Sequence, residues 1–292
     1  MFDLNNAKTF PANIAAPTPS RRRIIVKSSA SGSFITYIMI MNMIKSSEVV
    51  KIFLDYEIST TRDEKKYTIL PLKGITNNTA VVDVDNKKFV LRIPGKNPDV
   101  INRRSEKNNS IQAYEAGLTL PFIIFDENTG IKISEYFDIY TYKQQDFNNK
   151  DMRLNAFYIL NELHNSDFNF EENFSPLKVF NDIADISQPI EKEAKEVALE
   201  VIKKLYEIGI NNKPCHQDLY PANFVIYQNK TLLIDWEYSS MGDSYFDYAD
   251  LFWQNEFDHN DEFKKSSLIE IGIESDEDIE KFEYFEMLSM IT

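Results

Sequence analysis

The sequence predicts an α+β fold with two lobes, a small β-rich N-lobe followed by a larger α-helical C-lobe. Short runs rich in β-branched residues, separated by turn signals, fill residues 67–137. Beyond residue 150 the apolar residues recur at helical spacing instead. The chain has 292 residues and is 43% apolar, which is enough for one large or two small packed domains.

Two hairpins and one helix are expected in the N-lobe. Asp85-Asn86 joins the strands of the first hairpin, and Asn128-Thr129-Gly130 turns the second. The helix lies between the hairpins, and Gly117 follows its last turn, as is typical of a helix end. The expected strands cover residues 79–84, 87–95, 120–126 and 130–137, and the expected helix covers residues 101–116.

The C-lobe is expected to contain two long helices, two short strands and a C-terminal helix. The apolar residues of 189–208 form one continuous stripe that ends at Gly209. Ser275, with Asp278 three residues later, is a typical cap for the last helix. The other elements are a helix over residues 151–164 and strands in NFVIYQ (223–228) and TLLID (231–235).

The charge distribution divides the chain. Residues 1–47 hold one acidic and six basic residues, although the net charge of the whole chain is −14. This break predicts an N-terminal extension of unknown role over residues 1–60. The N-lobe then covers residues 61–137, and the C-lobe covers residues 138–292.

Bulk composition also narrows the partners and the compartment. An acidic chain argues against nucleic-acid binding, because phosphate backbones require a basic face. The longest apolar run, FITYIMIMNMI (34–44), is too short for a spanning helix, so no stable membrane insertion is expected. The single cysteine, Cys215, fits a reducing compartment, and we expect a cytoplasmic location.

The chemistry is concentrated in HQDLYPAN (216–223) and in LLIDWEY (232–238), which ends a strand. Phosphoryl transfer requires a carboxylate that accepts the hydroxyl proton, together with oxygen ligands for magnesium. Asp218 and Asn223 lie five residues apart, as in a kinase catalytic loop, and Asp235 follows after a short hairpin. His216 is interpreted as the hydrogen-bonding scaffold of this loop. The alternative is that all four are ordinary polar loop residues.

The segment CHQDLYPANFVIYQNKTLLIDWEYSSMGDSYFDYADLF resembles the phosphotransferase core of the choline and ethanolamine kinases, within the wider aminoglycoside-phosphotransferase group. The segments PLKGITNNTAVVDVDNKKFVLRIPGKNPDVINRRSEKNN and FDENTGIKISEYF extend the resemblance over residues 67–290. It is nearest to the bacterial choline kinases. The resemblance implies a protein-kinase-like fold and a transfer that uses ATP and Mg²⁺, with Asp218 as the base and the metal on Asn223 and Asp235.

The resemblance also implies a nucleotide site in the N-lobe. Arg92 stands where protein kinases have their phosphate-binding lysine, and Glu106 is its expected partner. The family usually has two glycines in the turn over the phosphates, whereas this chain has Lys73-Gly74. The remaining residues implied are Gly74, Thr76 and Asn77 in that turn, and Glu135 and Tyr136 at the bridge between the lobes, where backbone groups meet adenine.

The acceptor implied is a cationic alcohol, with choline giving phosphocholine. Asp235 and Glu237 point to the same side of a strand, so the Glu237 carboxylate can attract a cation. Asp243 is a second acidic candidate, with a role in the turn as an equal alternative. Trp236 points the other way, toward the core. A quaternary ammonium also requires aromatic faces. The candidates are Tyr220, Tyr238 and Trp253, with Tyr245 and Phe246 as further members.

Several alternatives stay open. One alternative is a related kinase whose acceptor is ethanolamine, thiamine or an aminoglycoside. Turnover measured with a panel of acceptors would distinguish these. A non-catalytic nucleotide- or choline-binding relative is the second class, suggested by the single glycine in the phosphate turn. A protein kinase is disfavoured because the chain shows no DFG or APE string. The sequence fixes neither the oligomeric state nor the choice between ATP and GTP.

Overall fold

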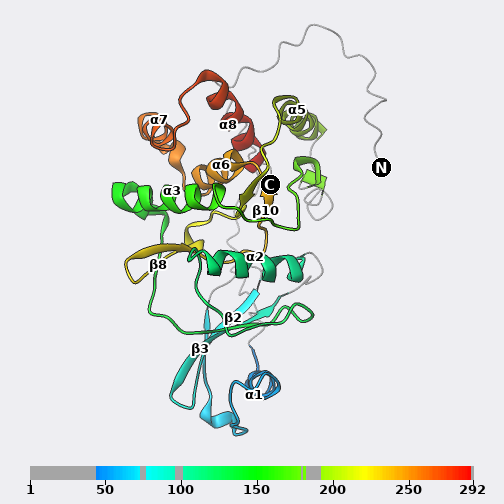
Figure 1. Cartoon of the computed structure of the whole chain (residues 1–292), viewed down its shortest axis with the longest axis vertical. Helices are drawn as coiled ribbons and strands as arrows, with labels where there is room; N and C mark the ends of the chain where they lie inside the picture. The colour runs from blue at the N-terminus through cyan, green and yellow to red at the C-terminus, as the bar shows by residue number, and fades with distance from the viewer. Residues whose placement is uncertain (1–43, 73–76, 96–100, 179, 182–191, 291–292) are drawn as a thin grey trace, which may run out of the picture. The chain divides into compact units, whose positions relative to one another are not determined.

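The computed structural model describes residues 44–72, 77–95, 101–178, 180–181 and 192–290, and they form the expected two-lobed α+β arrangement (Figure 1). Gly74 and Thr76 lie outside the described residues, as does most of the segment 1–60. Two separate hydrophobic clusters, one in each lobe, form the cores.

The N-lobe is built on an antiparallel sheet with the strand order β1-β2-β3-β5-β4. β-branched residues dominate β2, and the turn to β3 places Asp85 and Asn86 in the left-handed region, which confirms the first hairpin. Gly130 has a φ of +70° in the second hairpin. The strands are β1 Thr68–Leu72, β2 Asn77–Val84, β3 Lys87–Pro94, β4 Ile124–Phe125 and β5 Lys132–Glu135.

Helix α1 (Ser46–Asp55) covers the apolar side of this sheet. Val49 and Phe53 are fully buried, and the Phe53 ring meets Phe89 of β3 at 5.5 Å between centroids. Part of the segment 1–60 therefore belongs to the N-lobe core. The expectation of an extension with a boundary at residue 60 does not describe this helix, because its apolar face packs on the sheet.

Helix α2 (Arg103–Glu115) lies between the N-lobe sheet and the C-lobe (Figure 1). Asn102 caps its first turn by accepting a hydrogen bond from the Ser105 N–H at 3.1 Å. At its other end, Ala113 is buried in the C-lobe core rather than in the N-lobe core. The helix therefore connects the two lobes.

The C-lobe begins with β6 (Tyr140–Thr141), which pairs with β8 in a small second sheet. The expected strands over 223–228 and 231–235 are confirmed as a hairpin closed by the left-handed residues Gln228 and Asn229. The other strands of this lobe are β7 Lys213–Cys215, β8 Phe224–Tyr227, β9 Lys230–Leu233 and β10 Ser240–Gly242.

Helices form the rest of the C-lobe. Asn149, Asp243, Asn260 and Ser275 cap four of them through side-chain oxygens, which confirms the cap expected at Ser275. Aromatic side chains such as Phe252, Phe257 and Phe282 fill the core between them. The helices are α3 Lys150–His164, α5 Lys192–Ile208, α6 Ser244–Gln254, α7 Asp261–Glu270 and α8 Asp276–Ser289, with short 3-10 turns at Gln144–Asn148, Pro221–Asn223 and Phe257–His259. A further 3-10 turn, Glu64–Lys66, precedes β1 in the N-lobe.

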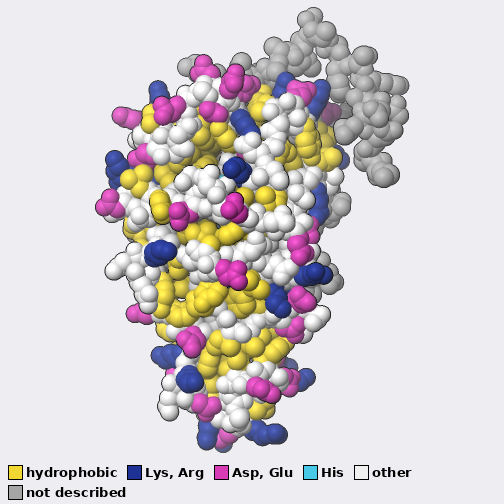
Figure 2. Space-filling view, viewed as in Figure 1, with side chains coloured by type: hydrophobic (Ala, Val, Ile, Leu, Met, Phe, Trp, Pro, Cys, Tyr) yellow, Lys and Arg dark blue, Asp and Glu magenta, His cyan; other side chains and the backbone are white. Residues whose placement is uncertain are grey.

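Acidic and basic side chains are interspersed on the face drawn in Figure 2. On that face the net charge of −14 is therefore not gathered in one patch. Within the described part of the chain, no helix is both long enough and apolar enough to cross a membrane.

Candidate active site

The loop between β7 and β8 brings Asp218 and Asn223 together. The Asn223 amide donates to the Asp218 carboxylate at 2.8 Å and to the Asp218 carbonyl at 2.9 Å. Asn223 is also the residue opposite Ile234 across the hairpin, because the Ile234 N–H donates to the Asn223 carbonyl. The expectation that Asn223 folds back beside Asp218 is confirmed. Asp235 follows Ile234 directly, just beyond the end of β9.

Two aspartates of helix α6 hold this loop by its backbone. Asp247 accepts hydrogen bonds from the N–H groups of His216 and Gln217, both at 2.9 Å. Asp250 accepts from the Leu219 N–H at 2.8 Å, and burial raises the pKa of the Asp250 carboxyl to about 7. The loop conformation thus depends on two buried carboxylates that contact backbone atoms.

His216 connects the loop to the strand that precedes Asp235. Its Nε2 donates to the Ile234 carbonyl at 3.0 Å, and the Trp236 ring packs edge-on at 4.9 Å between centroids. Burial lowers the pKa of His216, which keeps the imidazole neutral. These contacts support the scaffold role. Trp236 is fully buried, as expected.

A group of charged side chains lies where β3, α2 and the segment after β9 meet. We refer to Arg92, Arg103, Glu106, Asp235 and Glu237 as the charge cluster. Arg92 donates to Glu106 at 2.5 Å and approaches Asp235 at 3.3 Å, so the expected Arg92–Glu106 pair is confirmed. Arg103 takes the second oxygen of Glu106 at 2.7 Å.

Glu237 faces the same cluster. It accepts from Arg103 at 3.1 Å and from the Asn77 amide at 3.0 Å, and its side chain is 1% exposed. Carboxylate oxygens of Glu106, Asp235 and Glu237 lie within 4.8 Å of one another, so Asp235 and Glu237 face the same cluster, although both lie beyond the end of β9 rather than in a strand. The charge of Glu237 is nevertheless balanced by Arg103 rather than open to an acceptor.

The electrostatics of the charge cluster favour the binding of both an anion and a cation. Burial opposes ionisation of Glu106, but the Arg92 guanidinium outweighs it and holds the pKa of Glu106 below its usual value. Burial and the neighbouring Glu237 raise the pKa of Asp235 to about 7. Arg92 Nε and NH2 and Arg103 Nε are buried donors without a partner among the described residues. Buried donors of this kind suit a phosphate.

Lys132 on β5 is a further cation beside this cluster. It lies opposite Arg92 in the strand register, with its Nζ 5.2 Å from the ring centroids of Phe122 and Phe125. Burial, together with Arg92, lowers the pKa of Lys132 to about 8. Sequence reasoning missed this residue. The available signal was a lysine on a strand that pairs with the Arg92 strand.

The residues present fit a divalent cation. Asn223 directs its amide nitrogen to Asp218, which leaves its carbonyl oxygen as a ligand atom. The Asp235 side chain is 34% exposed, and a bound cation would offset the repulsion that raises its pKa. Both groups present oxygen, the atom that Mg²⁺ prefers.

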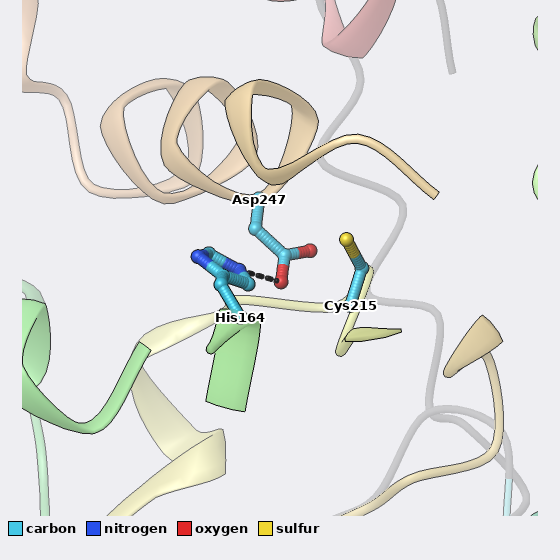
Figure 3. A group of neighbouring side chains, drawn as sticks. All are labelled: His164, Cys215 and Asp247. Atoms are coloured by element: carbon cyan, nitrogen blue, oxygen red, sulfur yellow. Dashed lines mark hydrogen bonds and ion pairs between the residues drawn. The ribbon is translucent and has the colours of Figure 1, made fainter. Parts of the chain in front are cut away.

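A second cluster, His164, Cys215 and Asp247, is buried behind the catalytic loop (Figure 3). His164 Nε2 meets Asp247 at 2.9 Å, and the Cys215 thiol donates to the Lys213 carbonyl at 3.4 Å. Burial raises the pKa of Cys215 well above its usual value, so the thiolate required of a metal ligand or nucleophile is disfavoured. This cluster supports the loop, because Asp247 also accepts hydrogen bonds from the backbone of His216 and Gln217.

The residues expected at the nucleotide site are partly engaged. Glu135 ends β5, and Tyr136 begins the connection to the C-lobe, as a bridge requires. The Tyr136 N–H donates to the Lys88 carbonyl at 2.9 Å, so it is not open to adenine without losing this bond. Asn77 contacts Arg103 and Glu237 rather than projecting into solvent.

The expected acceptor residues separate into two groups. Asp243 is a correction: it is fully buried and caps α6 by accepting from Tyr245 N–H, and it also pairs with Lys281 at 2.7 Å. These contacts saturate its carboxylate, so it forms no acceptor wall. Three aromatics are partly exposed, with Tyr220 48%, Tyr238 44% and Trp253 40% exposed.

Tyr245 and Phe246 are engaged elsewhere. The Tyr245 hydroxyl donates to Asp278 at 2.6 Å, and Phe246 packs on Phe174 with 4.6 Å between centroids. Both residues serve the packing of α6 against its neighbours. They contribute structure rather than the aromatic faces expected for an acceptor.

Comparison with known proteins agrees with this geometry. The model of a phosphotransferase enzyme family matches residues 68–270. Protein LicA from Haemophilus influenzae is 35% identical over 188 residues, which are 60% of this chain and only 55% of that protein. A second LicA, from the Rd strain of the same species, is 34% identical over 60% of this chain and 69% of its own length.

The fold matches solved structures as well. The crystal structure of choline kinase LicA from Streptococcus pneumoniae has a TM-score of 0.71 at 26% identity, covering 84% of this chain and 87% of that one. An ethanolamine kinase from Plasmodium vivax matches with a TM-score of 0.67 at 17% identity, covering 84% and 80%, and so shares the fold. Because the family model matches residues 68–270, which are most of this chain, the chain belongs to the phosphotransferase enzyme family and has the kinase-like α+β fold of that family.

Proposed function

We propose that the protein is a small-molecule kinase that transfers the γ-phosphate of ATP to the hydroxyl of choline and releases phosphocholine. The observation that carries this proposal is the Asn223–Asp218 hydrogen bond in a loop whose hairpin brings Asn223 beside Asp235. Similarity to the choline kinase LicA structure supports the choice of acceptor. The reaction is placed in the cytoplasm, where ATP is available.

Asp218 is the proposed catalytic base. The choline hydroxyl oxygen forms a bond to the γ-phosphorus while the bond to the bridging oxygen of ADP breaks, and the hydroxyl proton moves to Asp218. Asn223 fixes the orientation of this carboxylate by donating to it at 2.8 Å. The backbone bonds from Asp247 and Asp250 keep the loop in place during this transfer.

Arg92 is the proposed phosphate ligand, held by Glu106 and offering two buried donors without a protein partner among the described residues. Asn223 and Asp235 would hold Mg²⁺. A bound Mg²⁺ would supply positive charge that offsets the negative charge of the nucleotide phosphates. Glu135 and Tyr136 remain our proposal for the adenine end, through the backbone of the lobe bridge.

The acceptor pocket rests on aromatic faces. Tyr220 and Tyr238 lie on the same segments as the catalytic groups, and Trp253 is a third open ring. Aromatic rings attract a quaternary ammonium through their negative faces. Because Glu237 is paired with Arg103, these rings carry the cation recognition in this proposal.

The test is ADP release from the purified protein with Mg²⁺ and ATP, with choline, ethanolamine, thiamine and kanamycin in parallel. Choline-dependent turnover is expected. Turnover only with another acceptor would replace the substrate and keep the mechanism. If the wild-type protein and Asp218→Asn give the same rate, the protein is a binding relative rather than a kinase.

A further inference from the structure

We propose that Arg103 is a positioning residue that assembles the phosphate and metal side of the site by joining helix α2 to the segment that carries Asp235. The inference rests on the proposed function, because Arg92 and Asp235 are the groups that would meet phosphate and Mg²⁺. Arg103 itself contacts other protein side chains and acts through them.

One guanidinium connects three parts of the chain. Arg103 NH1 donates to Glu106 Oε2 at 2.7 Å within α2, and to Glu237 Oε2 at 3.1 Å in the C-lobe. Its NH2 donates to Asn77 Oδ1 at 3.3 Å, at the start of β2. The Asn77 amide closes this triangle by donating to the same Glu237 oxygen at 3.0 Å.

These contacts are buried. The side chains of Arg103, Glu106 and Glu237 are 8%, 0% and 1% exposed. Removing one partner of a buried ion pair strongly destabilises the folded protein, because the other charge stays buried without compensation. The neighbouring Arg104 is 71% exposed, and its Nε is 3.8 Å from Glu171. Two adjacent arginines therefore provide a matched pair for experiment.

The fold makes room for Arg103. A Cβ added to Gly130, which has a φ of +70°, would lie 3.0 Å from Arg103 Nε and 2.6 Å from Pro94 Cγ. The hairpin turn between β4 and β5 thus passes directly over the guanidinium stem. A Cβ at this position would require Pro94 and the Arg103 side chain to shift.

These contacts affect the two residues proposed to hold phosphate and Mg²⁺, Arg92 and Asp235, in different ways. Glu106 divides its oxygens between Arg92 and Arg103, so Arg103 limits the rotation of the carboxylate that orients Arg92. Glu237 is two residues from Asp235, whose backbone has a φ of +66°. Holding Glu237 therefore restrains the backbone on which Asp235 is presented.

Helix α2 keeps other attachments to the C-lobe when Arg103 is replaced. The Asn109 amide donates to the Ser239 carbonyl at 2.9 Å and to its hydroxyl at 3.0 Å. Ala113 is buried in the C-lobe core. We therefore expect Arg103→Met to fold, with its main effect on the alignment of the charge cluster.

The kinetic test compares Arg103→Met with Arg104→Met. For Arg103→Met, the KM for ATP and the Mg²⁺ concentration that gives half of the maximal rate are expected to rise about 10- to 100-fold, with a smaller change in kcat, as for residues that orient ligand groups. Arg103→Lys is expected to recover part of this loss. If Arg103→Met matches Arg104→Met in both quantities, the proposal is overturned.

A readout without ligands separates this proposal from the proposed function. Urea unfolding of the wild-type protein, Arg103→Met, Glu237→Gln and the double variant forms a cycle, and the double variant is expected to lose less stability than the two single losses added together. Additive losses would overturn the tie. Absence of wild-type turnover with every acceptor would instead overturn the kinase proposal, while the cycle still decides the role of Arg103. Should Arg103→Met fail to fold, Arg103→Lys replaces it in the cycle.

Discussion

The catalytic loop and the charge cluster are built in opposite ways. The loop is held within one lobe, and its backbone N–H groups at His216, Gln217 and Leu219 are bonded to two carboxylates of α6. The charge cluster spans both lobes through Arg92–Asp235 and Arg103–Glu237, and it retains buried donors without a partner in the described chain.

This difference indicates a division of labour. A loop with its bonds already made keeps Asp218 in one orientation before any ligand arrives, which lowers the reorganisation required during the reaction. A cluster with unmatched donors and a carboxyl pKa raised to about 7 at Asp235 suits ligands of both charges. In the proposed function, the first region provides rigidity and the second provides affinity for the nucleotide.

The largest expected effect concerns the loop. Asp218→Asn removes the proposed base but keeps the shape of the side chain, so kcat should fall about 10²- to 10⁴-fold. Because the α6 contacts are made by the loop backbone, the melting temperature and nucleotide affinity should change little. Turnover and ADP binding measure the two quantities. A large loss of ADP affinity would show that the two regions are not separable.

Asp247→Ala tests the rigidity of the loop from behind. Asp247 is fully buried and accepts bonds from His216, Gln217 and His164, so its removal leaves several buried groups unsatisfied. The free energy of unfolding is expected to fall by about 3 kcal/mol, measured in urea, with loss of turnover. Asp151→Ala, at an exposed position of α3, is the control and should stay close to the wild-type protein.

Gly130→Ala tests the packing around the charge cluster. Gly130 and Gly272 have φ values of +70° and +80°, but only Gly130 has neighbours within 4 Å of an added Cβ. Both alanine variants pay for a left-handed backbone, about 1 kcal/mol each. Gly130→Ala should lose about 1 kcal/mol more and also weaken ATP binding. Equal losses and equal ATP affinities would show that Arg103 is not crowded there.

The last expected effect is a pH dependence of stability. The folded pKa of Asp250, about 7, lies above its ordinary value of 3.8, so the folded state holds this proton more tightly. Stability is therefore fullest below about pH 4 for this group and is lost as pH rises toward 7. Compared with Asp250→Asn, the wild-type protein should lose on the order of 1 kcal/mol more per pH unit across that window. Parallel stability curves would contradict the raised pKa.

Much of this site could be predicted because its groups are close in sequence or follow a strand period. The five-residue spacing of Asp218 and Asn223 leads to a direct hydrogen bond. Glu237 also lies beside Asp235 as expected, but a turn after β9 places it there, since Asp235 has a left-handed backbone. The Asp85-Asn86 turn likewise fixes the hairpin that presents Arg92. Local conformation decided each of these outcomes.

The remainder depends on distant contacts. Asp247 and Asp250 bond to backbone atoms about 30 residues away, and no side-chain pattern identifies such partners. The charge of Asp243 makes it an acceptor candidate, but its place before a helix is a typical cap signal, and in the structure it caps α6. Helix α1 lies in a segment that charge alone set apart, but its apolar stripe packs on the N-lobe sheet.

Cys215 gives the loop an intrinsic reporter. It is the only cysteine of the chain, it is fully buried, and it lies next to His216. A thiol reagent can modify it only when this part of the lobe opens, so the rate of modification in native protein measures how often the catalytic loop separates from its support. The rate at which the Cys215 sulfur is labelled, measured with and without nucleotide, would therefore report local opening of the folded protein around this loop.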